Sequence, residues 1–426
     1  MSKKSVTGKD AGKAVATSVR AGEEEFSTLP LVDKRTYLDG VLPKEKMALI
    51  LGDPDGKKLA RAMQPHELYW LFKENGEPEA MELLALASPE QCVFILDMEL
   101  WRRWSFSEDK AVEYLGYIML GSEEHFLELL PHLDFNLLSL FLGRELIVAG
   151  GIGDINTDEE RQTDWDRTFD DVFLIKFKNP KHATIIGNFL ELVCRLDNPL
   201  YASLMESVSG EIDIESEEEC YHLKSGRLAD LGFPPHDEAL ELYSRINPAT
   251  FTPGRNKVLL QAVEATTLPQ LFLNGTTFLE RVILRADSEL FRMELNYLIN
   301  TALVADEAHL ADMEQMRSVV ERVYGYLNIA LEYLSEGDET KGVEIITGEY
   351  LKRLFQLGFS LVLDLKYRAD KLGEQDYATG KALSGLKTSR PRFYRGLDPD
   401  GIDGYREFRE MQDVTMVSDF LKRLEG

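Results

Sequence analysis

The chain is poor in cysteine. Cys92, Cys194 and Cys220 are the only three in 426 residues, and they form no C-x-x-C pair. Disulfide frameworks and structural zinc modules need several cysteines at short, paired spacings. The sequence therefore argues against both kinds of scaffold and predicts a protein of a reducing compartment, which we expect to be the cytoplasm.

Long apolar runs are missing as well. The longest, from residue 135 to 153, is interrupted by Arg144 and Glu145, whereas a membrane span needs about 20 mostly apolar residues. The first residues contain lysines but no apolar stretch of signal-peptide length. We therefore expect no membrane insertion. We expect residues 1–26 to be a disordered tail, because they are rich in Lys, Ser, Gly, Ala and Glu.

Positive charge is scarce, since 48 Lys and Arg stand against 74 Asp and Glu and give a formal net charge of -26. A surface this acidic repels phosphate backbones at long range. We therefore expect no nucleic-acid partner, and the excess of acids is typical of a charged surface that keeps a protein soluble.

Catalytic and metal-binding motifs are also missing. The sequence contains no G-x-S-x-G, no Walker loop and no H-E-x-x-H. Cys220, His222 and His236 could converge on a metal ion, but no fourth ligand is evident. Residues 154, 156 and 158 have the spacing of the first calcium ligands without the turn glycine that follows them in a calcium loop. We therefore predict no metal site and no cofactor.

What the sequence does contain is a regular series of prolines. Their spacings are 11, 11, 13 and 11 residues, by subtraction along Pro43, Pro54, Pro65, Pro78 and Pro89. Proline suits the first turn of a helix, where its missing N–H has no partner to lose. The series predicts a stack of short helices. Asp53 is expected to cap one of them, and Ser88 followed by Pro89 and Glu90 is the best helix start in the chain.

The rest of the chain predicts a mainly α protein, in which a superhelix of short helices is followed by a bundle of longer ones. At most a minor β element is expected, near residues 172–177. The glycines at 150, 151 and 153 are interpreted as a junction loop rather than a nucleotide site, because acidic residues follow them. Three long helices are expected between Asp287 and Leu372, and a last helix between Tyr405 and Leu424.

These patterns predict five parts. They are a tail (1–26), a short-helix repeat domain (27–150), a linker with a helical subdomain (151–250), a helical bundle (251–385), and a C-terminal loop and helix docked on the bundle (386–426).

One loop is basic, although the chain as a whole is acidic. It contains Lys387, Arg390, Arg392 and Arg395, with Tyr394 among them. Guanidinium groups suit carboxylate or phosphate recognition, so the loop is a candidate site for an anion or a protein partner. The alternative, which we favour, is that these arginines pair with the protein's own acids and dock the C-terminal segment.

Aromatic residues near the repeat junctions give a second candidate. Tyr69, Trp70, Trp101 and Trp104 are core residues in the simpler interpretation. If they are exposed, they could line a groove for a partner helix.

Two stretches carry a family resemblance. Residues 68–101 include the run Ala87-Ser88-Pro89-Glu90-Gln91, and residues 226–243 include Gly226-Arg227-Leu228-Ala229-Asp230. Both resemble an uncharacterised bacterial family known only as a domain of unknown function, over nearly the whole chain after the tail. Residues 43–142 also resemble the cytosolic short-helix repeat of bacterial magnesium transporters, which implies a fold and no activity.

The leading hypothesis is a cytoplasmic helical protein that acts as an interaction or scaffold module. One alternative is an enzyme or small-anion-binding protein with a pocket lined by arginines and carboxylates, between the repeat region and the bundle. Another is a regulator that responds to divalent cations through the acidic runs. The sequence specifies neither the protein partner nor the oligomeric state.

Overall fold

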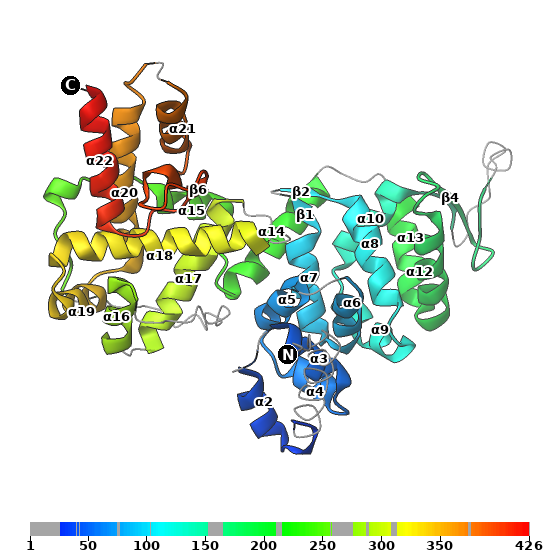
Figure 1. Ribbon diagram of the computed structural model, residues 1–426. Coiled ribbons are helices and arrows are strands. Elements are labelled where there is room, and N and C mark those ends of the chain that lie inside the picture. Colours follow the sequence, from blue (N-terminus) through cyan, green and yellow to red (C-terminus); the bar gives the residue numbers. More distant parts are fainter. Residues whose placement is uncertain are drawn as a thin grey trace, which may run out of the picture. The chain divides into compact units, whose positions relative to one another are not determined.

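Helices make up most of the protein (Figure 1). The computed structural model describes residues 26–39, 41, 43–74, 77–102, 104–151, 165–209, 215–255, 257, 276–286, 289–307, 313–373 and 376–425. Within these residues the strands form three sheets of two strands each. The prediction of a mainly α protein with minor β structure is confirmed.

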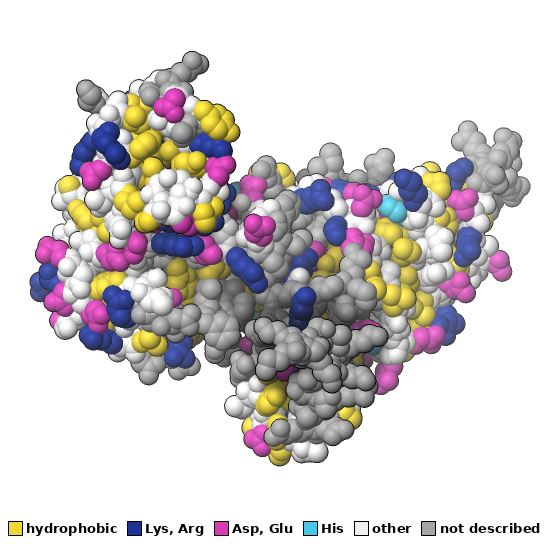
Figure 2. Space-filling model, in the orientation of Figure 1, with side chains coloured by type: hydrophobic (Ala, Val, Ile, Leu, Met, Phe, Trp, Pro, Cys, Tyr) yellow, Lys and Arg dark blue, Asp and Glu magenta, His cyan; other side chains and the backbone are white. Residues whose placement is uncertain are grey.

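The chain divides into two compact units, Met1–Lys224 and Ser225–Gly426. The boundary falls inside one helix, α14 (Glu215–Asp230). The five-part division from the sequence stays a prediction. Acidic and basic side chains are interspersed over the face of the protein that Figure 2 shows.

The N-terminal unit is a series of short helices with two hairpins. Its elements before α14 are α2 (Leu31–Asp39), α3 (Pro43–Gly52), α4 (Gly56–Arg61), α5 (Pro65–Glu74), α6 (Glu77–Leu86), α7 (Pro89–Glu99), β1 (Trp101–Arg102), β2 (Ser105–Phe106), α8 (Glu108–Met119), α9 (Glu123–Leu129), η1 (Leu130–His132), α10 (Phe135–Glu145), β3 (Leu146–Gly150), β4 (Phe173–Phe177), α12 (Ala183–Leu196) and α13 (Asn198–Ser209).

The prolines start helices as expected, with one exception. Pro43, Pro65 and Pro89 are the first residues of α3, α5 and α7, and Pro78 is the second residue of α6. Ahead of α7, Ser88 forms a capping box with Gln91, in which each side chain bonds the other residue's backbone N–H. Helix starts are local features, which is why the sequence predicted them well.

Pro54 is the exception, and Asp53 is not a helix cap. Helix α4 begins at Gly56, after Asp55. The buried Asp53 carboxylate accepts a hydrogen bond from the Asp55 backbone N–H at 2.8 Å, and both of its oxygens lie 2.8 Å from Nζ of Lys34. Asp53 therefore ties α2 to the turn before α4 rather than capping a helix.

The strand expected near residues 172–177 is β4, and its partner is β3. The two run antiparallel, from Leu146 opposite Phe177 to Gly150 opposite Phe173. Gly150 has a positive φ of 88°, and a Cβ there would lie 2.4 Å from the carbonyl oxygen of Val172. The glycine interpreted as part of a junction loop is thus the last residue of a strand, where no other residue fits without strain. Gly153 and residues 154–158 lie outside the described residues.

The C-terminal unit contains the longer helices. Its elements are α15 (His236–Leu240), η2 (Glu241–Tyr243), η3 (Pro248–Thr250), α16 (Phe278–Ala286), α17 (Glu289–Ala305), α18 (Met313–Ser335), α19 (Glu339–Gly348), α20 (Leu351–Ala369), α21 (Tyr377–Leu386), β5 (Phe393–Tyr394), η4 (Arg395–Leu397), β6 (Tyr405–Arg406) and α22 (Met411–Glu425). In its core α18 crosses α20, where a Cβ on Gly358 would lie 2.0 Å from the Tyr326 carbonyl oxygen.

Two helix predictions in this unit need correction. The segment expected to hold three long helices contains a further break at Glu349, between α19 and α20. The buried Glu349 carboxylate accepts hydrogen bonds from the backbone N–H groups of Gly254 and Tyr350, which fixes a turn there. The last helix begins at Met411 rather than at Tyr405, because Tyr405 and Arg406 form β6.

No single helix among the described residues is long and apolar enough to cross a membrane. One bent pair, residues 123–132 with 135–145, passes such a test by length and composition, with a 106° bend between its two halves.

Candidate interaction surface

The predicted basic loop lies between α21 and β5 and continues into the β5–β6 hairpin. We call residues 387–407 the C-terminal clasp. The Arg392 backbone N–H donates to the carbonyl of Gly385 at 2.9 Å, which ties the loop to the end of α21. In the hairpin Phe393 pairs with Arg406, and Tyr394 pairs with Tyr405.

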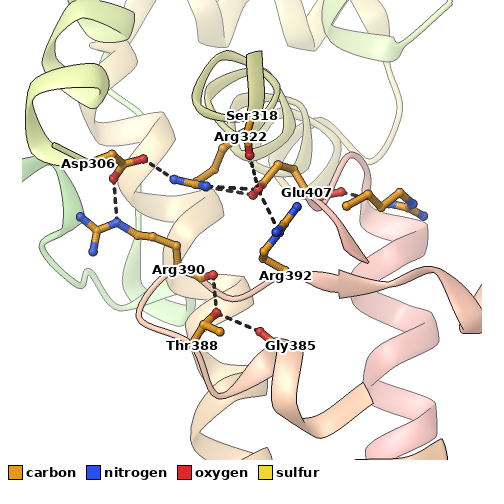
Figure 3. A network of polar contacts seen from close by, with 9 residues as sticks. Asp306, Ser318, Arg322, Gly385, Thr388, Arg390, Arg392 and Glu407 are labelled. Atoms are coloured by element: carbon orange, nitrogen blue, oxygen red, sulfur yellow. Dashed lines mark hydrogen bonds and ion pairs between the residues drawn. The ribbon is translucent and has the colours of Figure 1, made fainter. Parts of the chain in front are cut away.

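Arg390 joins the clasp to the loop after α17 (Figure 3). Its Nε donates to Oδ1 of Asp306 at 2.8 Å, and its Nη2 donates to the Ala305 carbonyl at 3.0 Å. Its guanidinium also lies 3.8 Å from the ring centroid of Tyr243. Asp306 accepts a further hydrogen bond from Arg322 of α18. The Arg390 guanidinium is therefore already paired with a carboxylate of the protein itself, that of Asp306.

Glu407 is the centre of the second half of the network. Its side chain is buried, and it accepts hydrogen bonds from Nε of Arg322 at 2.9 Å, from Nη2 of the same residue at 3.1 Å, and from the Ser318 hydroxyl at 2.8 Å. Nε of Arg392 lies 3.4 Å from the same carboxylate. Ion pairs with this many hydrogen bonds are strong and directional.

Arg406 holds the remaining acids of the clasp. It donates to both oxygens of Asp398 and both oxygens of Asp413, at 2.7–3.0 Å. Its guanidinium also lies 3.9 Å from the centroid of the buried Phe393 ring. The hydrogen bonds to Arg406 lower the pKa of Asp398, so this pair stays charged at neutral pH.

Burial and charge act together on the groups inside the network. Burial raises the pKa of Tyr243, and the nearby Asp306 carboxylate raises it further. Burial alone would lower the pKa of Arg322, but its bonds to Glu407 and its attraction to Asp306 raise the pKa instead. The tyrosine therefore stays neutral and the arginine stays charged, as in a structural network rather than a proton-transfer site.

A second, exposed group of side chains lies on α21 and the hairpin. We call Tyr377, Lys381, Tyr394 and Tyr405 the tyrosine face. Tyr377 is 81% exposed and Tyr405 is 37% exposed. Nζ of Lys381 lies 5.0 Å from the Tyr377 ring centroid, and the rings of Tyr394 and Tyr405 are 5.8 Å apart. In Figure 2, hydrophobic side chains gather over the end of the C-terminal unit where α20, α21 and α22 lie.

The tyrosine face is held in place by hydrogen bonds. The Tyr405 hydroxyl donates to the Lys381 carbonyl at 3.0 Å, and the Tyr394 hydroxyl donates to Asp403 at 3.1 Å. Lys381 donates to the other oxygen of Asp403 at 2.5 Å. This bond lowers the pKa of Asp403 and raises that of Lys381. The rings of Tyr394 and Tyr405 are therefore held in place, and those of Tyr377 and Tyr405 are exposed.

The other two basic side chains of the predicted loop, Arg395 and Lys387, also have partners within the protein. Nη2 of Arg395 lies 3.6 Å from Asp400, and Nζ of Lys387 donates to the Leu372 carbonyl at 3.2 Å. The structure thus brings Arg390, Arg392 and Glu407 into one network and leaves Tyr394 on the tyrosine face. The arginine–carboxylate pairs are the arrangement that the sequence favoured.

Three of the four predicted groove aromatics are core residues. Tyr69, Trp70 and Trp101 are buried, and the Tyr69 hydroxyl donates to Glu99 at 2.6 Å. The simpler interpretation from the sequence therefore holds for these three, and they line no exposed groove, because their rings pack inward against other aromatic rings of α5, α7 and the β1–β2 hairpin. Trp104, in the turn of that hairpin, is 61% exposed.

The predicted metal candidates do not converge. Within the described residues no group of three or more His, Cys, Asp or Glu side chains could hold a metal ion. Cys220 is buried, and His222 is exposed beside Glu218. His236 lies 3.3 Å from Glu307.

Sequence reasoning missed Asp306, Arg322 and Glu407 in the network, and Tyr377, Lys381 and Tyr405 on the tyrosine face. The sequence shows that tyrosines lie on either side of the basic loop, at positions 377 and 405, but not that they are exposed. Partners such as Arg322 and Glu407 are 85 residues apart, so no local pattern joins them.

A model of a protein family, described as a family of unknown function (DUF6178), matches residues 23–426. No curated protein and no solved structure matches the chain.

Proposed function

Because the chain belongs to DUF6178, a family of unknown function, its relatives supply no activity, and we propose that it is a protein-interaction or scaffold module of the cytoplasm. Its contact surface is the tyrosine face. The single observation that carries this proposal is the exposure of Tyr377 and Tyr405 on either side of Lys381, with Tyr405 fixed by its hydrogen bond to the Lys381 carbonyl. None of the three cysteines is in a disulfide bond, which fits a reducing compartment.

Tyrosines of this kind suit protein recognition. A tyrosine ring offers a large contact area while only two side-chain torsions must be fixed, so binding costs little conformational entropy. Tyrosine is also enriched among the residues that dominate binding energy at interfaces. Rings that are already ordered in the free protein lower that cost further.

The network in the clasp favours this role over small-anion binding. Arg390 and Arg322 already pair with Asp306, and Glu407 is bonded to Arg322. An anion would have to displace these carboxylates from buried hydrogen bonds, which is unfavourable. We therefore assign the arginines to holding the clasp, which in turn carries Tyr394 and Tyr405.

The proposal is tested by photo-cross-linking in cells that carry the natural gene. A photo-reactive phenylalanine analogue replaces Tyr377 in one variant and Tyr333 in the control, because Tyr333 is an exposed tyrosine of α18. We expect cross-linked protein adducts from position 377 and none from position 333. Equal adducts from both positions, or none from position 377, would contradict the proposal.

A further inference from the structure

The backbone passes from the N-terminal unit to the C-terminal unit once, between Lys224 and Ser225. Both residues lie inside α14, which is helical from Glu215 to Asp230. A boundary between compact units is more often an exposed linker outside the regular elements. Here it falls within a continuous helix, so a rotation of one unit relative to the other has to bend α14.

The first half of α14 is anchored to the N-terminal unit. Glu217 accepts a hydrogen bond from the Phe106 backbone N–H at 2.8 Å. The centroids of the Tyr221 and Trp101 rings are 5.7 Å apart, and Nζ of Lys224 lies 5.8 Å from the centroid of the same Trp101 ring. These contacts continue to the last residue of the unit, so this half of the helix is fixed to the β1–β2 hairpin.

The second half of α14 ends in an ordered turn. The Phe233 backbone N–H donates to the Leu228 carbonyl at 2.9 Å, and the Gly232 N–H donates to the Ala229 carbonyl at 3.0 Å. Gly232 has a φ of 84°, which is the conformation that glycine supplies after a helix end. Leu228 and Phe233 are both buried. The second half of the helix is therefore fixed to the turn that follows it.

Between the two anchored halves lie Ser225 and Gly226. Gly226 is exposed, and a Cβ on it would meet no atom within 4 Å. Packing therefore does not require glycine at this position, and the property that separates it from alanine is its weaker preference for the helix. Serine is a weaker helix former than alanine as well. Sharp bends of helices occur at Gly and Ser pairs, and this pair directly follows the boundary.

Water can reach the same turn of the helix. His222 and Leu223, one turn before Gly226, are exposed. In an α-helix the Gly226 N–H donates to the His222 carbonyl, so this hydrogen bond lies on the side of α14 that is open to water. Water can therefore replace the bond when a bend lengthens it, which lowers the free energy that the bend costs.

We infer that α14 bends at Ser225 and Gly226, and that this bend is the hinge about which the two units change their orientation. The anchoring contacts lie on either side of the hinge, so each unit keeps its own core during the motion. The hinge does not depend on the tyrosine face. The inference and the proposed function can therefore each fail without the other.

Hydrogen exchange of the full chain tests the bend itself. We expect the protection factors of the amides of residues 226–229, whose bonds span the hinge, to be at least about tenfold lower than those of residues 219–222. The double variant Ser225→Ala, Gly226→Ala should raise protection at 226–229 by about tenfold, because alanine is the better helix former at both positions. Equal protection of the two groups in the wild type would overturn the inference.

The matched control for both measurements is Gly380→Ala. Gly380 lies in α21, and a Cβ on it also meets no atom within 4 Å. This substitution adds the same methyl group to another helix, so it should leave the protection of α14 unchanged. A rise at residues 226–229 as large as that in the double variant would overturn the inference, because the effect would then not be local to the hinge.

Double electron–electron resonance tests the motion of the units. Spin labels are placed on cysteines introduced at Glu206 of α13 and Glu344 of α19, which are both exposed. The labelled chain carries Cys194→Ser, because Cys194 is the cysteine that is not buried. We expect a broad distribution of distances between the labels, which narrows in the double variant and keeps its width in the Gly380→Ala control. A distribution of the same width in all three chains would overturn the inference.

Discussion

Single residues in this protein differ sharply in how much they contribute to the free energy of unfolding, and burial sets the difference. Glu407 and Glu425 each bond an arginine through both carboxylate oxygens. Glu407 lies in the core with Arg322, whereas Glu425 is near the end of α22 and open to water. In the core a lost partner leaves a charge that water cannot reach.

Glu407→Gln should destabilise the protein by about 3 kcal/mol. This is the lower end for removal of one partner of a buried ion pair, because Asp306 still pairs with Arg322. Urea unfolding at neutral pH measures the change. Glu425→Gln is the control and should shift the midpoint far less, since its pair with Arg368 is exposed. Similar shifts for both variants would show that Glu407 does not hold the clasp.

His125 should make stability depend on pH. Burial and the nearby Arg61 lower the pKa of His125 below its ordinary value of 6.5. The unfolded chain therefore binds a proton at a higher pH than the folded one. As the pH falls through 6.5 toward the folded pKa, the free energy of unfolding decreases, and above 6.5 this loss is absent.

Urea unfolding at about pH 7.5 and about pH 5.5 checks this prediction. His125→Asn should lose less stability between the two conditions than the wild type does. The exposed His222 provides the control, and His222→Asn should keep the wild-type pH dependence. If His125→Asn keeps it as well, His125 is not the group responsible.

At the scale of elements, helices here are fixed at their ends and where they cross. The cap of α7 is a complete capping box, and Gln91 also donates to the carbonyls of Ala60 and Met63. The start of α8 has the same residue type, Ser107, without a side-chain cap bond. A comparison of substitutions at Ser88 and Ser107 therefore measures how much the cap hydrogen bond contributes to stability.

Ser88→Ala should destabilise the protein by about 1 kcal/mol, because it removes a cap hydrogen bond that α7 cannot replace. Thermal or urea unfolding measures the loss. Ser107→Ala should change stability by less than about 0.5 kcal/mol. A larger loss at Ser107 than at Ser88 would contradict the assignment of the cap.

The crossing of α18 and α20 makes a second prediction at this scale. Gly358→Ala places a Cβ against the Tyr326 carbonyl and should cost about 1–3 kcal/mol or more. Gly226→Ala, in the interior of α14, meets nothing within 4 Å. It should stabilise the protein by about 0.5–1 kcal/mol, because alanine is the better helix former. Equal effects in urea unfolding would rule out a tight crossing.

At the scale of the whole molecule, the net charge of -26 should make stability depend on salt. Acids that repel one another in the compact state are screened by added salt. We therefore expect sodium chloride to raise the melting temperature at neutral pH. Near pH 4.8, the sequence pI, the rise should shrink. A melting temperature that falls with salt at neutral pH would show that ion pairs outweigh the repulsion.

The sequence predicted the fold class and many helix starts, because these depend on neighbours in the chain. Ser88 and Pro89 show this, since a cap and a first-turn proline act within one turn. Asp53 shows the limit. Its residue type and its position before Pro54 suggested a helix cap, but the buried Lys34 of another helix bonds its carboxylate. This partner is 19 residues away in the chain, so no pattern in the residues next to Asp53 predicts it.

The sequence predicted the internal pairing of the basic loop but not the tyrosine face. The basic loop was found from charge alone, and so was the preference for internal pairing. Which aromatic rings are exposed could not be predicted, because Tyr69 and Tyr377 are the same residue type, and only packing buries the first and leaves the second in water.

The distance in sequence between Glu407 and Arg322 has a consequence for biosynthesis. Glu407 follows its main partner by 85 residues, so the ribosome joins all of α18 and α20 to the chain before it reads the codon for Glu407. Until then the buried Arg322 has only one of its carboxylate partners, Asp306. The C-terminal unit can therefore complete its core only after residue 407 has emerged, whereas the residues of the N-terminal unit have emerged long before.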